Sequence, residues 1–268
     1  MFKFKFDDLI NDEDYGYIFK KDKEFFDKYL KEGQWNKETN IDPNSRDNDN
    51  CFQFGLLPQQ IVGDINKSKI YLLNLNPSFD VKYFKDFEDE STLEPYINDI
   101  LHLKYSSKNL KEYPFYFLNP KLKETSGYEW WNNGHHFKSY ISIYKNKYKN
   151  KDEDYIRKIL AKEFCCIELI PYHAKKLPIK KGEAKELPSV KYVKKYVKEV
   201  LLPKAKSGKI IIICLRAEKY WLNDFTKEEK KHIYFSDNPQ TVPFKLENII
   251  YKDNRPEKKV KEILGIKK

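Results

Sequence analysis

Four runs of mostly apolar residues dominate the hydrophobic pattern of this chain. They are KIYLLNL at 69–75, FCCIELI at 164–170, KIIIICL at 209–215 and the shorter HIYFS at 232–236. A strand with one face in water alternates apolar and polar residues, whereas a strand covered on both faces is apolar almost throughout. The pattern therefore predicts four buried strands.

Helical spacing appears between and around these runs. Residues 20–31 place four apolar side chains on one helical face: Phe25, Phe26, Tyr29 and Leu30. Residues 189–201 repeat apolar positions at intervals of three and four: Val190, Val193, Tyr196, Val197, Val200 and Leu201. We predict that Ser189 caps this second helix, and that Pro203 and Gly208 end it.

Two more helices are predicted near the C-terminus. One begins within RAEKYWLNDF at 216–225, and the other opens at Pro256 with Val260, Ile263 and Leu264 facing inward. Strands that alternate with helices indicate a parallel sheet between helical layers. The predicted fold class is therefore α/β, a three-layer α/β/α arrangement around a central, mostly parallel, four-stranded sheet.

We expect residues 1–268 to form one domain with four parts. Residues 1–54 are an N-terminal helical extension, and residues 55–80 contain the first strand with its motif. Residues 81–160 are a large aromatic-rich insertion, in which the segment 115–137 is the most aromatic. Residues 161–268 supply the remaining core.

The charge balance is basic, with 51 Lys and Arg against 41 Asp and Glu, a formal net charge of +10. Lys and Arg supply most of the sequence-independent affinity of proteins for nucleic acid, so the excess points to a polyanionic partner. A lysine-rich, solvated surface without such a partner is the other interpretation. On charge alone we hold both interpretations open.

Other sequence features favour a cytoplasmic monomer. No apolar run approaches the roughly 20 residues that span a bilayer, and the first residues do not resemble a signal peptide. The four cysteines are Cys51, Cys165, Cys166 and Cys214, and none forms a C-x-x-C pair. Buried thiols in a reducing compartment are therefore expected, and we predict no metal or other cofactor.

The polar residues that follow the predicted strands are the candidate site. In open α/β sheets, ligands bind beyond the carboxyl ends of the strands. Those ends carry polar or cationic side chains in this chain, at Asn76, residues 171–173 (PYH), Arg216 and residues 238–240 (NPQ). They are expected to converge on one edge of the sheet.

Two of these strand ends resemble the motifs of a known family. LNLNPS at 73–78 resembles the first motif of the uracil-DNA glycosylase superfamily, in particular its mismatch-specific branch, and DNPQTVP at 237–243 resembles the second. The order of strands and helices between them also agrees. The resemblance covers roughly residues 55–248, more loosely between 79 and 162.

The resemblance implies the roles of several residues. The amide of Asn76 would hold the attacking water, and Asn238 would hydrogen-bond the departing base. Pro77, Pro239 and Gln240 would press against the DNA backbone or fill the vacated stack. The family reads the flipped base near the end of the second core strand, which is the position of Glu168.

The chain departs from the family pattern at several positions. Asn74 and Ser78 stand where the family often has glycine, so both add side chains near the substrate. Asn238 replaces the histidine that is widespread in the second motif, and Gln240 replaces a serine. These differences put the substrate pose in doubt.

Further residues are candidates for substrate binding. An ionised Glu168 accepts hydrogen bonds and cannot donate them, so it suits the exocyclic amine of a cytosine-type base. Phe79 is a candidate stacking platform, and His173 lies at the same sheet edge. Trp130 and Trp131 offer aromatic faces to a base or a sugar, although a plug over the sheet is an equally simple role.

Some bacterial antiphage members of the superfamily excise heavily modified cytosines, such as glucosylated hydroxymethylcytosine, from phage DNA. This chain is similar to them in its mismatch-type motifs and aromatic insertion. The expected function is therefore a monofunctional DNA glycosylase that acts on double-stranded DNA. Two alternatives stay open: a metal-dependent nuclease using Glu183-Ala184-Lys185, and a reader of modified DNA without catalysis.

Overall fold

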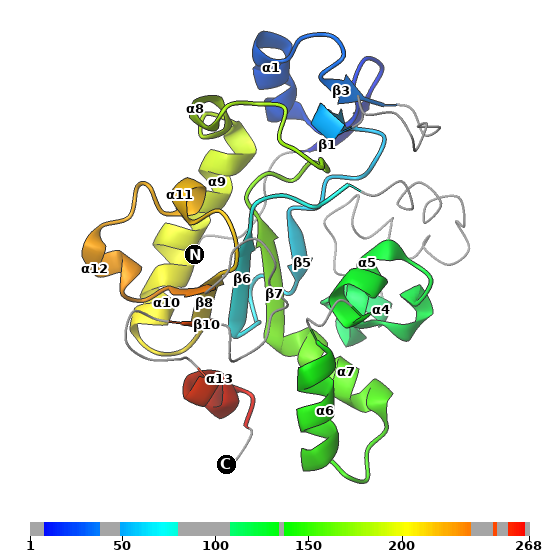
Figure 1. The fold of residues 1–268 in the computed structure, drawn as a ribbon, viewed down its shortest axis with the longest axis vertical. Coiled ribbons are helices and arrows are strands. Elements are labelled where there is room, and N and C mark those ends of the chain that lie inside the picture. Colours follow the sequence, from blue (N-terminus) through cyan, green and yellow to red (C-terminus); the bar gives the residue numbers. More distant parts are fainter. Residues whose placement is uncertain are drawn as a thin grey trace.

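A mixed α/β fold is built around one six-stranded sheet (Figure 1). The computed structural model describes residues 8–37, 49–79, 108–133, 137–236, 249–250 and 257–265. Across the sheet the strand order is β10-β9-β8-β6-β7-β5. The strands are β5 (Ile61–Gly63), β6 (Ile70–Asn74), β7 (Phe164–Glu168), β8 (Ile211–Cys214), β9 (Tyr234–Ser236) and β10 (Ile249–Ile250).

The four strands predicted from the apolar runs are β6, β7, β8 and β9, and they are parallel to one another. The sheet is larger than predicted, because β5 and β10 pair antiparallel with β7 and β9 at its two edges. Both are only two or three residues long. Such short segments leave no clear periodic signal in the sequence.

Both faces of the central strands are covered, which explains their continuous apolar runs. Successive residues of a strand point to opposite faces. Tyr71 and Leu73 of β6 accordingly enter one buried cluster, whereas Ile70 and Leu72 enter a second cluster on the other face. The same alternation holds in β7 and β8.

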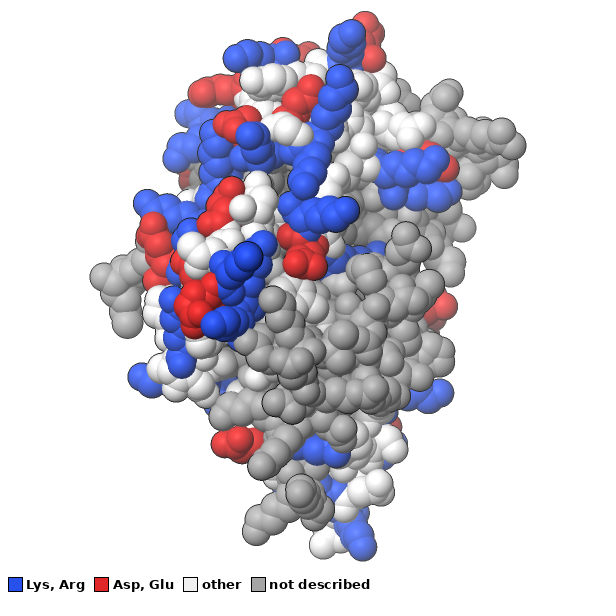
Figure 2. Space-filling model, turned by 60° about the vertical axis from the view of Figure 1, so that its left-hand side comes forward, with Lys and Arg blue, Asp and Glu red and all other residues white. Residues whose placement is uncertain are grey.

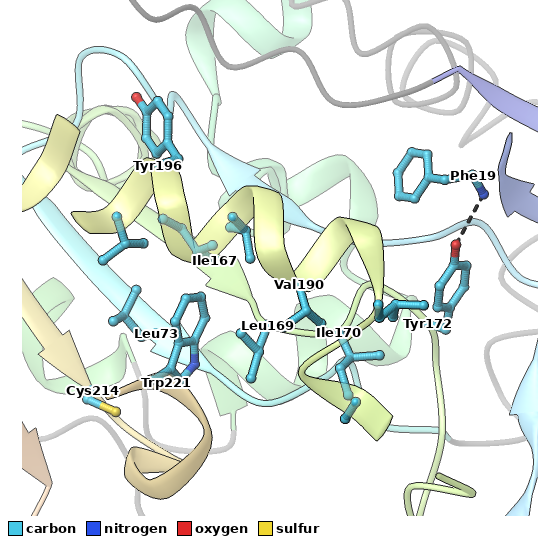
Figure 3. Packing of buried hydrophobic residues seen from close by; sticks show 14 of the residues in the cluster. Phe19, Leu73, Ile167, Leu169, Ile170, Tyr172, Val190, Tyr196, Cys214 and Trp221 are labelled. Carbon is cyan, nitrogen blue, oxygen red and sulfur yellow. Dashed lines mark hydrogen bonds between the residues drawn. The ribbon is translucent and has the colours of Figure 1, made fainter. Parts of the chain in front are cut away.

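The first face is covered mainly by helices from the second half of the chain. They include α8 (Lys181–Ala184), α9 (Pro188–Tyr196), the π-helical turn η5 (Val197–Leu201), α10 (Leu202–Lys206), α11 (Glu218–Trp221) and α12 (Lys227–Lys230). Figure 3 shows Leu73, Ile167, Val190 and Trp221 packed together in this layer. Trp221 is fully buried there.

The second face is covered mainly by the aromatic part of the chain. Its elements are α4 (Lys108–Glu112), η2 (Tyr116–Leu118), η3 (Pro120–Leu122), α5 (Ser126–Tyr128), the π-helical turn η4 (Glu129–Asn133), α6 (Lys138–Lys147), α7 (Glu153–Glu163) and α13 (Glu257–Ile263). Val260 and Leu264 at the C-terminal end are buried in this layer, and Ile263 is partly buried, as predicted.

The N-terminal segment packs against the first face. The predicted helix is present as α1 (Lys20–Tyr29), but a hairpin of β1 (Leu9–Asp12) and β2 (Gly16–Phe19) precedes it. Two further short strands, β3 (Trp35–Asn36) and β4 (Phe52–Gln53), pair in parallel. The segment is therefore not purely helical.

The helical segment that starts with α9 begins at a different residue than predicted; it ends just before Gly208, as predicted, but not at Pro203. Pro188 is its first residue, and Ser189 donates its backbone N–H to the buried carboxylate of Asp22, 2.9 Å away, instead of capping the helix itself. The helix also continues past Pro203 to Lys206. The π-helical turn η5 ends two residues before this proline, in the turn whose regular α-helical bonding a proline disrupts.

Candidate functional site

A cavity of about 190 Å³ opens at the carboxyl end of the parallel strands. Counted along the chain, the parallel strands lie in the order second, first, third, fourth, so the first strand β6 has β7 on one side and β8 on the other. The connections from β6 and β7 cover opposite faces of the sheet. A doubly wound sheet binds ligands where its winding direction changes, and the cavity lies at that place.

The floor of the cavity is formed by two polar residues at matching positions on neighbouring strands. Asn74 ends β6 and Glu168 ends β7, and the two are direct partners in the parallel register. Both side chains project to the aromatic face of the sheet, in phase with Leu72 and Cys166. Nδ2 of Asn74 donates to Oε1 of Glu168 at 3.2 Å.

Glu168 is a buried carboxyl group with one unused oxygen. Its side chain is only 5% exposed, and within the described part of the chain no donor reaches its Oε2. Burial raises the pKa of Glu168 to about 7, although hydrogen bonds from Asn74 and Cys166 and the charge of Arg216 act in the opposite direction. A neutral carboxyl group can donate as well as accept, so the sequence-based view of a purely accepting Glu168 is incomplete.

The amide of Asn76 is held in one orientation. Its Nδ2 donates to the backbone oxygens of Pro77 and Ala174, both at 2.9 Å. Reversing the amide would place its oxygen against two carbonyl oxygens, so the hydrogen-bond network fixes the assignment. No donor among the described residues reaches Oδ1, and Asn76 lines the cavity. Asn76 lies two residues beyond the end of β6, so the strand itself ends at Asn74.

His173 holds the loop that carries Asn76, and it does not line the cavity. Its Nδ1 lies 3.0 Å from the backbone oxygen of Ser78, to which it donates. Burial lowers the pKa of His173 to about 4, although the backbone oxygens of Ser78 and Leu57 oppose this shift. His173 therefore acts as a neutral support of this loop, and its predicted contact with substrate stays a prediction.

The opposite wall of the cavity comes from the aromatic segment. Phe117, Gly127, Trp130 and Trp131 line it, as do Phe79 and Gln59. Trp131 is 5% exposed and packs edge-on against Phe115, so it serves the core as well as the cavity. Trp130 is 44% exposed and stands at the open side. Trp131 is thus mainly a core residue, whereas Trp130 is largely exposed and lies beside Arg216.

Among the described residues that line the cavity, Arg216 is the only one with a cationic side chain. It lies two residues beyond the end of β8, and its guanidinium lies 5.6 Å from the ring centre of Trp130. The next residue, Ala217, has a φ of 61°, a left-handed conformation that is uncommon for alanine. The sequence predicts Arg216 at this sheet edge, because it follows a buried strand, but does not assign it a role.

The predicted site is therefore partly assembled. Six of the predicted residues line one cavity together with the two tryptophans: Asn74, Asn76, Pro77, Ser78, Phe79 and Glu168. Asn238, Pro239 and Gln240 lie outside the described residues. Gln59, Phe117 and Gly127 were not predicted, because nothing in their local sequence distinguishes them from ordinary loop and core residues.

The residues of the alternative nuclease motif lie elsewhere. Glu183 belongs to the short helix α8, not to a loop, and its carboxylate accepts the backbone N–H of Lys180 as a helix cap. Within the described residues, no cluster of three or more His, Cys, Asp or Glu side chains could hold a metal ion.

All four cysteines are buried. No described helix combines the length and apolar character needed to cross a membrane.

The charged surface near α9 is mixed and not uniformly basic. Figure 2 shows Lys and Arg side chains interspersed with Asp and Glu over the side that carries α8 to α12. Several of these charges form ion pairs, for example Lys191 with Glu186 at 2.7 Å and Lys198 with Glu229 at 3.5 Å. Among the described residues on this side, cations and anions alternate instead of forming a continuous basic track.

Comparison of the chain with protein-family models, with curated proteins and with solved structures found no match.

Proposed function

We propose that the cavity binds a base extruded from DNA and that Asn76 presents a water molecule to its deoxyribose, so that the protein acts as a DNA glycosylase. A base inside a duplex must leave the stack before an enzyme can reach it. Cleavage of its glycosidic bond passes through an electron-poor sugar, as in other glycoside cleavages. Such a sugar needs a well-placed water more than a strong base.

The observation that carries this proposal is the fixed Oδ1 of Asn76, which no donor of the described residues reaches. Both hydrogens of its amide are used by carbonyl oxygens at 2.9 Å, so the remaining oxygen is available to accept from water at the cavity wall. This is the geometry that orients a nucleophile without removing its proton in advance.

The size and polarity of the cavity favour a single-ring base. A cavity of about 150 Å³ holds one benzene molecule. The cavity beside Asn76 measures about 190 Å³ and carries the carboxyl group of Glu168 on its floor. A cytosine-type base fits both features, because its exocyclic amine can donate to that carboxyl group.

We further propose that the base carries a modification such as a glucosyl group and that the substrate is phage DNA. A glucosyl group on the base would have to remain at the open side of the cavity, where the half-exposed Trp130 offers an aromatic face. Action on glucosylated hydroxymethylcytosine in phage DNA is consistent with that arrangement. It rests on the resemblance of the motifs and not on the cavity alone.

Counting abasic sites tests the proposed activity. Purified protein is incubated with plain, uracil-containing and glucosylated DNA, and alkali-labile sites are measured. We expect sites mainly in the modified DNA and a rate about 10²-fold to 10³-fold lower for Asn76→Ala, since positioning of the nucleophile is lost. Chelation with EDTA should leave the rate unchanged.

The chain offers a matched control for this variant. Asn119 also precedes a proline and is buried, but its Oδ1 accepts the backbone N–H of Lys121 and it does not line the cavity. Asn119→Ala is expected to lower stability and leave the excision rate unchanged. Equal rates for wild type and Asn76→Ala, or lesions in plain DNA at the same frequency, would refute the proposal.

A further inference from the structure

We propose that Glu168 is the general acid of the reaction, donating a proton to the ring nitrogen beside the exocyclic amine of a cytosine-type base. This inference rests on the proposed function and adds a second catalytic group to it. Asn76 would act on the sugar, and Glu168 on the departing base. The two residues line the same cavity from different strand ends.

The hydrogen bonds of Glu168 fit a general acid better than a residue that only binds the base. Oε1 is fixed by Nδ2 of Asn74 at 3.2 Å and by the thiol of Cys166 at 3.5 Å. Oε2 is buried and has no partner among the described residues. An unsatisfied buried oxygen is costly unless a ligand pairs with it, so the cavity is incomplete without one. Oε2 therefore has a hydrogen-bonding position open to a ligand. In the neutral carboxyl group, this oxygen can carry the proton.

The surroundings of Glu168 keep the proton available near neutral pH. Two neutral groups bond the carboxyl group of Glu168: the amide of Asn74 on β6 and the thiol of Cys166 on its own strand. The amide of Gln60, before β5, donates to the backbone oxygen of Glu168. Burial raises the pKa of the Cys166 thiol well above its usual range, so it stays protonated. Arg216, after β8, is the facing cation that lowers the pKa of Glu168, and burial outweighs it.

The reaction then balances without any other reactant. The O–H bond of Glu168 breaks as its proton moves to the ring nitrogen, and the bond between the base and C1′ breaks with its electron pair passing to the ring. The base leaves as a neutral molecule. Water held by Asn76 adds to C1′, and the proton that it releases returns through solvent to the Glu168 carboxylate. The sum is hydrolysis of one glycosidic bond.

A glutamine at position 168 distinguishes a general acid from a group that only binds the base. A carboxamide keeps one acceptor and one donor in the arrangement of a neutral carboxyl group, but it cannot transfer a proton. Glu168→Gln therefore preserves recognition of the base edge and removes the acid. Glu168→Ala removes both.

The experiment measures single-turnover release of base from oligonucleotides that each contain one cytosine, 5-methylcytosine or 5-hydroxymethylcytosine. Binding is measured separately with a 2′-fluorinated, non-cleavable version of the same oligonucleotide. We expect Glu168→Gln to bind within about threefold of wild type but to release base at least about 100-fold more slowly, the usual contribution of a general acid. The wild-type rate should fall about tenfold per pH unit above pH 7, and the variant rate should not.

The outcomes separate this inference from the proposed function. Wild-type release rates that are matched by Glu168→Gln, or a parallel loss of binding and rate in that variant, would overturn the acid role and leave the glycosylase activity standing. A wild-type protein that releases no base from any of these oligonucleotides or from glucosylated phage DNA would overturn both. A cooperative thermal unfolding transition of Glu168→Gln at pH 5, close to that of wild type, shows that the variant is folded.

Discussion

At the scale of single residues, the cavity is defined by how three buried or half-buried polar groups are satisfied. The amide of Asn76 is fixed by two carbonyl oxygens, and His173 supports the same loop from behind. No described residue donates to the Oε2 of Glu168. A fold that satisfies most buried polar groups and leaves one open at a cavity has the form expected of a binding site.

The raised pKa of Glu168 predicts a pH dependence of stability. A carboxyl group whose pKa is higher in the folded than in the unfolded state favours folding at low pH, and this contribution is lost as the pH rises. With a pKa of about 7 against an ordinary value of 4.5, the loss develops between these two values. It amounts to about 3 kcal/mol at complete ionisation.

Urea unfolding of wild type and Glu168→Gln at pH 5 and pH 8 measures this effect. We expect the free energy of unfolding of wild type, relative to the variant, to fall by about 3 kcal/mol between the two pH values. The comparison between the two proteins is needed because His173, with a pKa lowered to about 4, shifts stability in the opposite sense below pH 6.5. A constant difference would mean that Glu168 is ionised throughout.

At the scale of elements, one long-range contact decides where α9 begins. The fully buried Asp22 of α1 accepts the backbone N–H of Ser189 at 2.9 Å and the hydroxyl of Tyr172 at 2.8 Å. Tyr172 in turn accepts the N–H of Phe19 at 3.1 Å, as drawn in Figure 3. A carboxylate at a helix N-terminus is stabilised by the free N–H groups there. The N-terminal segment is thus tied to the sheet layer by a polar link.

Removing that link should destabilise the protein. Asp22→Ala leaves two buried donors without their acceptor, and we expect a loss of about 3 kcal/mol in the free energy of unfolding, measured with urea. Asp27 of the same helix provides the control, because its ion pair with Lys23 is largely exposed. Asp27→Ala should cost less than about 1 kcal/mol. Similar losses for the two variants would contradict the structural role of Asp22.

At the scale of the whole molecule, the side shown in Figure 2 mixes positive and negative side chains, and several of them form ion pairs. The formal net charge is nevertheless +10. If the protein binds DNA as proposed, its long-range attraction comes from this total charge, and its specificity comes from the polar floor of the cavity. Attraction of that kind is screened by salt.

DNA affinity is therefore expected to fall with ionic strength. Contact with only two phosphates weakens binding about tenfold between 50 and 200 mM salt, and more contacts steepen the slope. Fluorescence anisotropy with a labelled oligonucleotide measures Kd across this range. A salt-independent Kd would show that phosphates contribute nothing, and would favour the interpretation of a merely lysine-rich surface.

The sequence by itself determined the positions of the four parallel strands, the main helices and the polar residues at the strand ends. It did so because burial on both faces leaves an apolar run, and a helix leaves a period of three and four. It also indicated that Asn74, Asn76 and Glu168 belong near one edge of the sheet.

Only the tertiary structure decided which of these residues meet. The pairing of Asn74 with Glu168 depends on β6 lying beside β7, and the orientation of Asn76 depends on a carbonyl oxygen of Ala174, far away in the chain. The short edge strands, the partner of Asp22 and the unpaired oxygen of Glu168 have the same origin. Local sequence encodes whether a residue is buried, whereas its partner is chosen by the packing of distant segments.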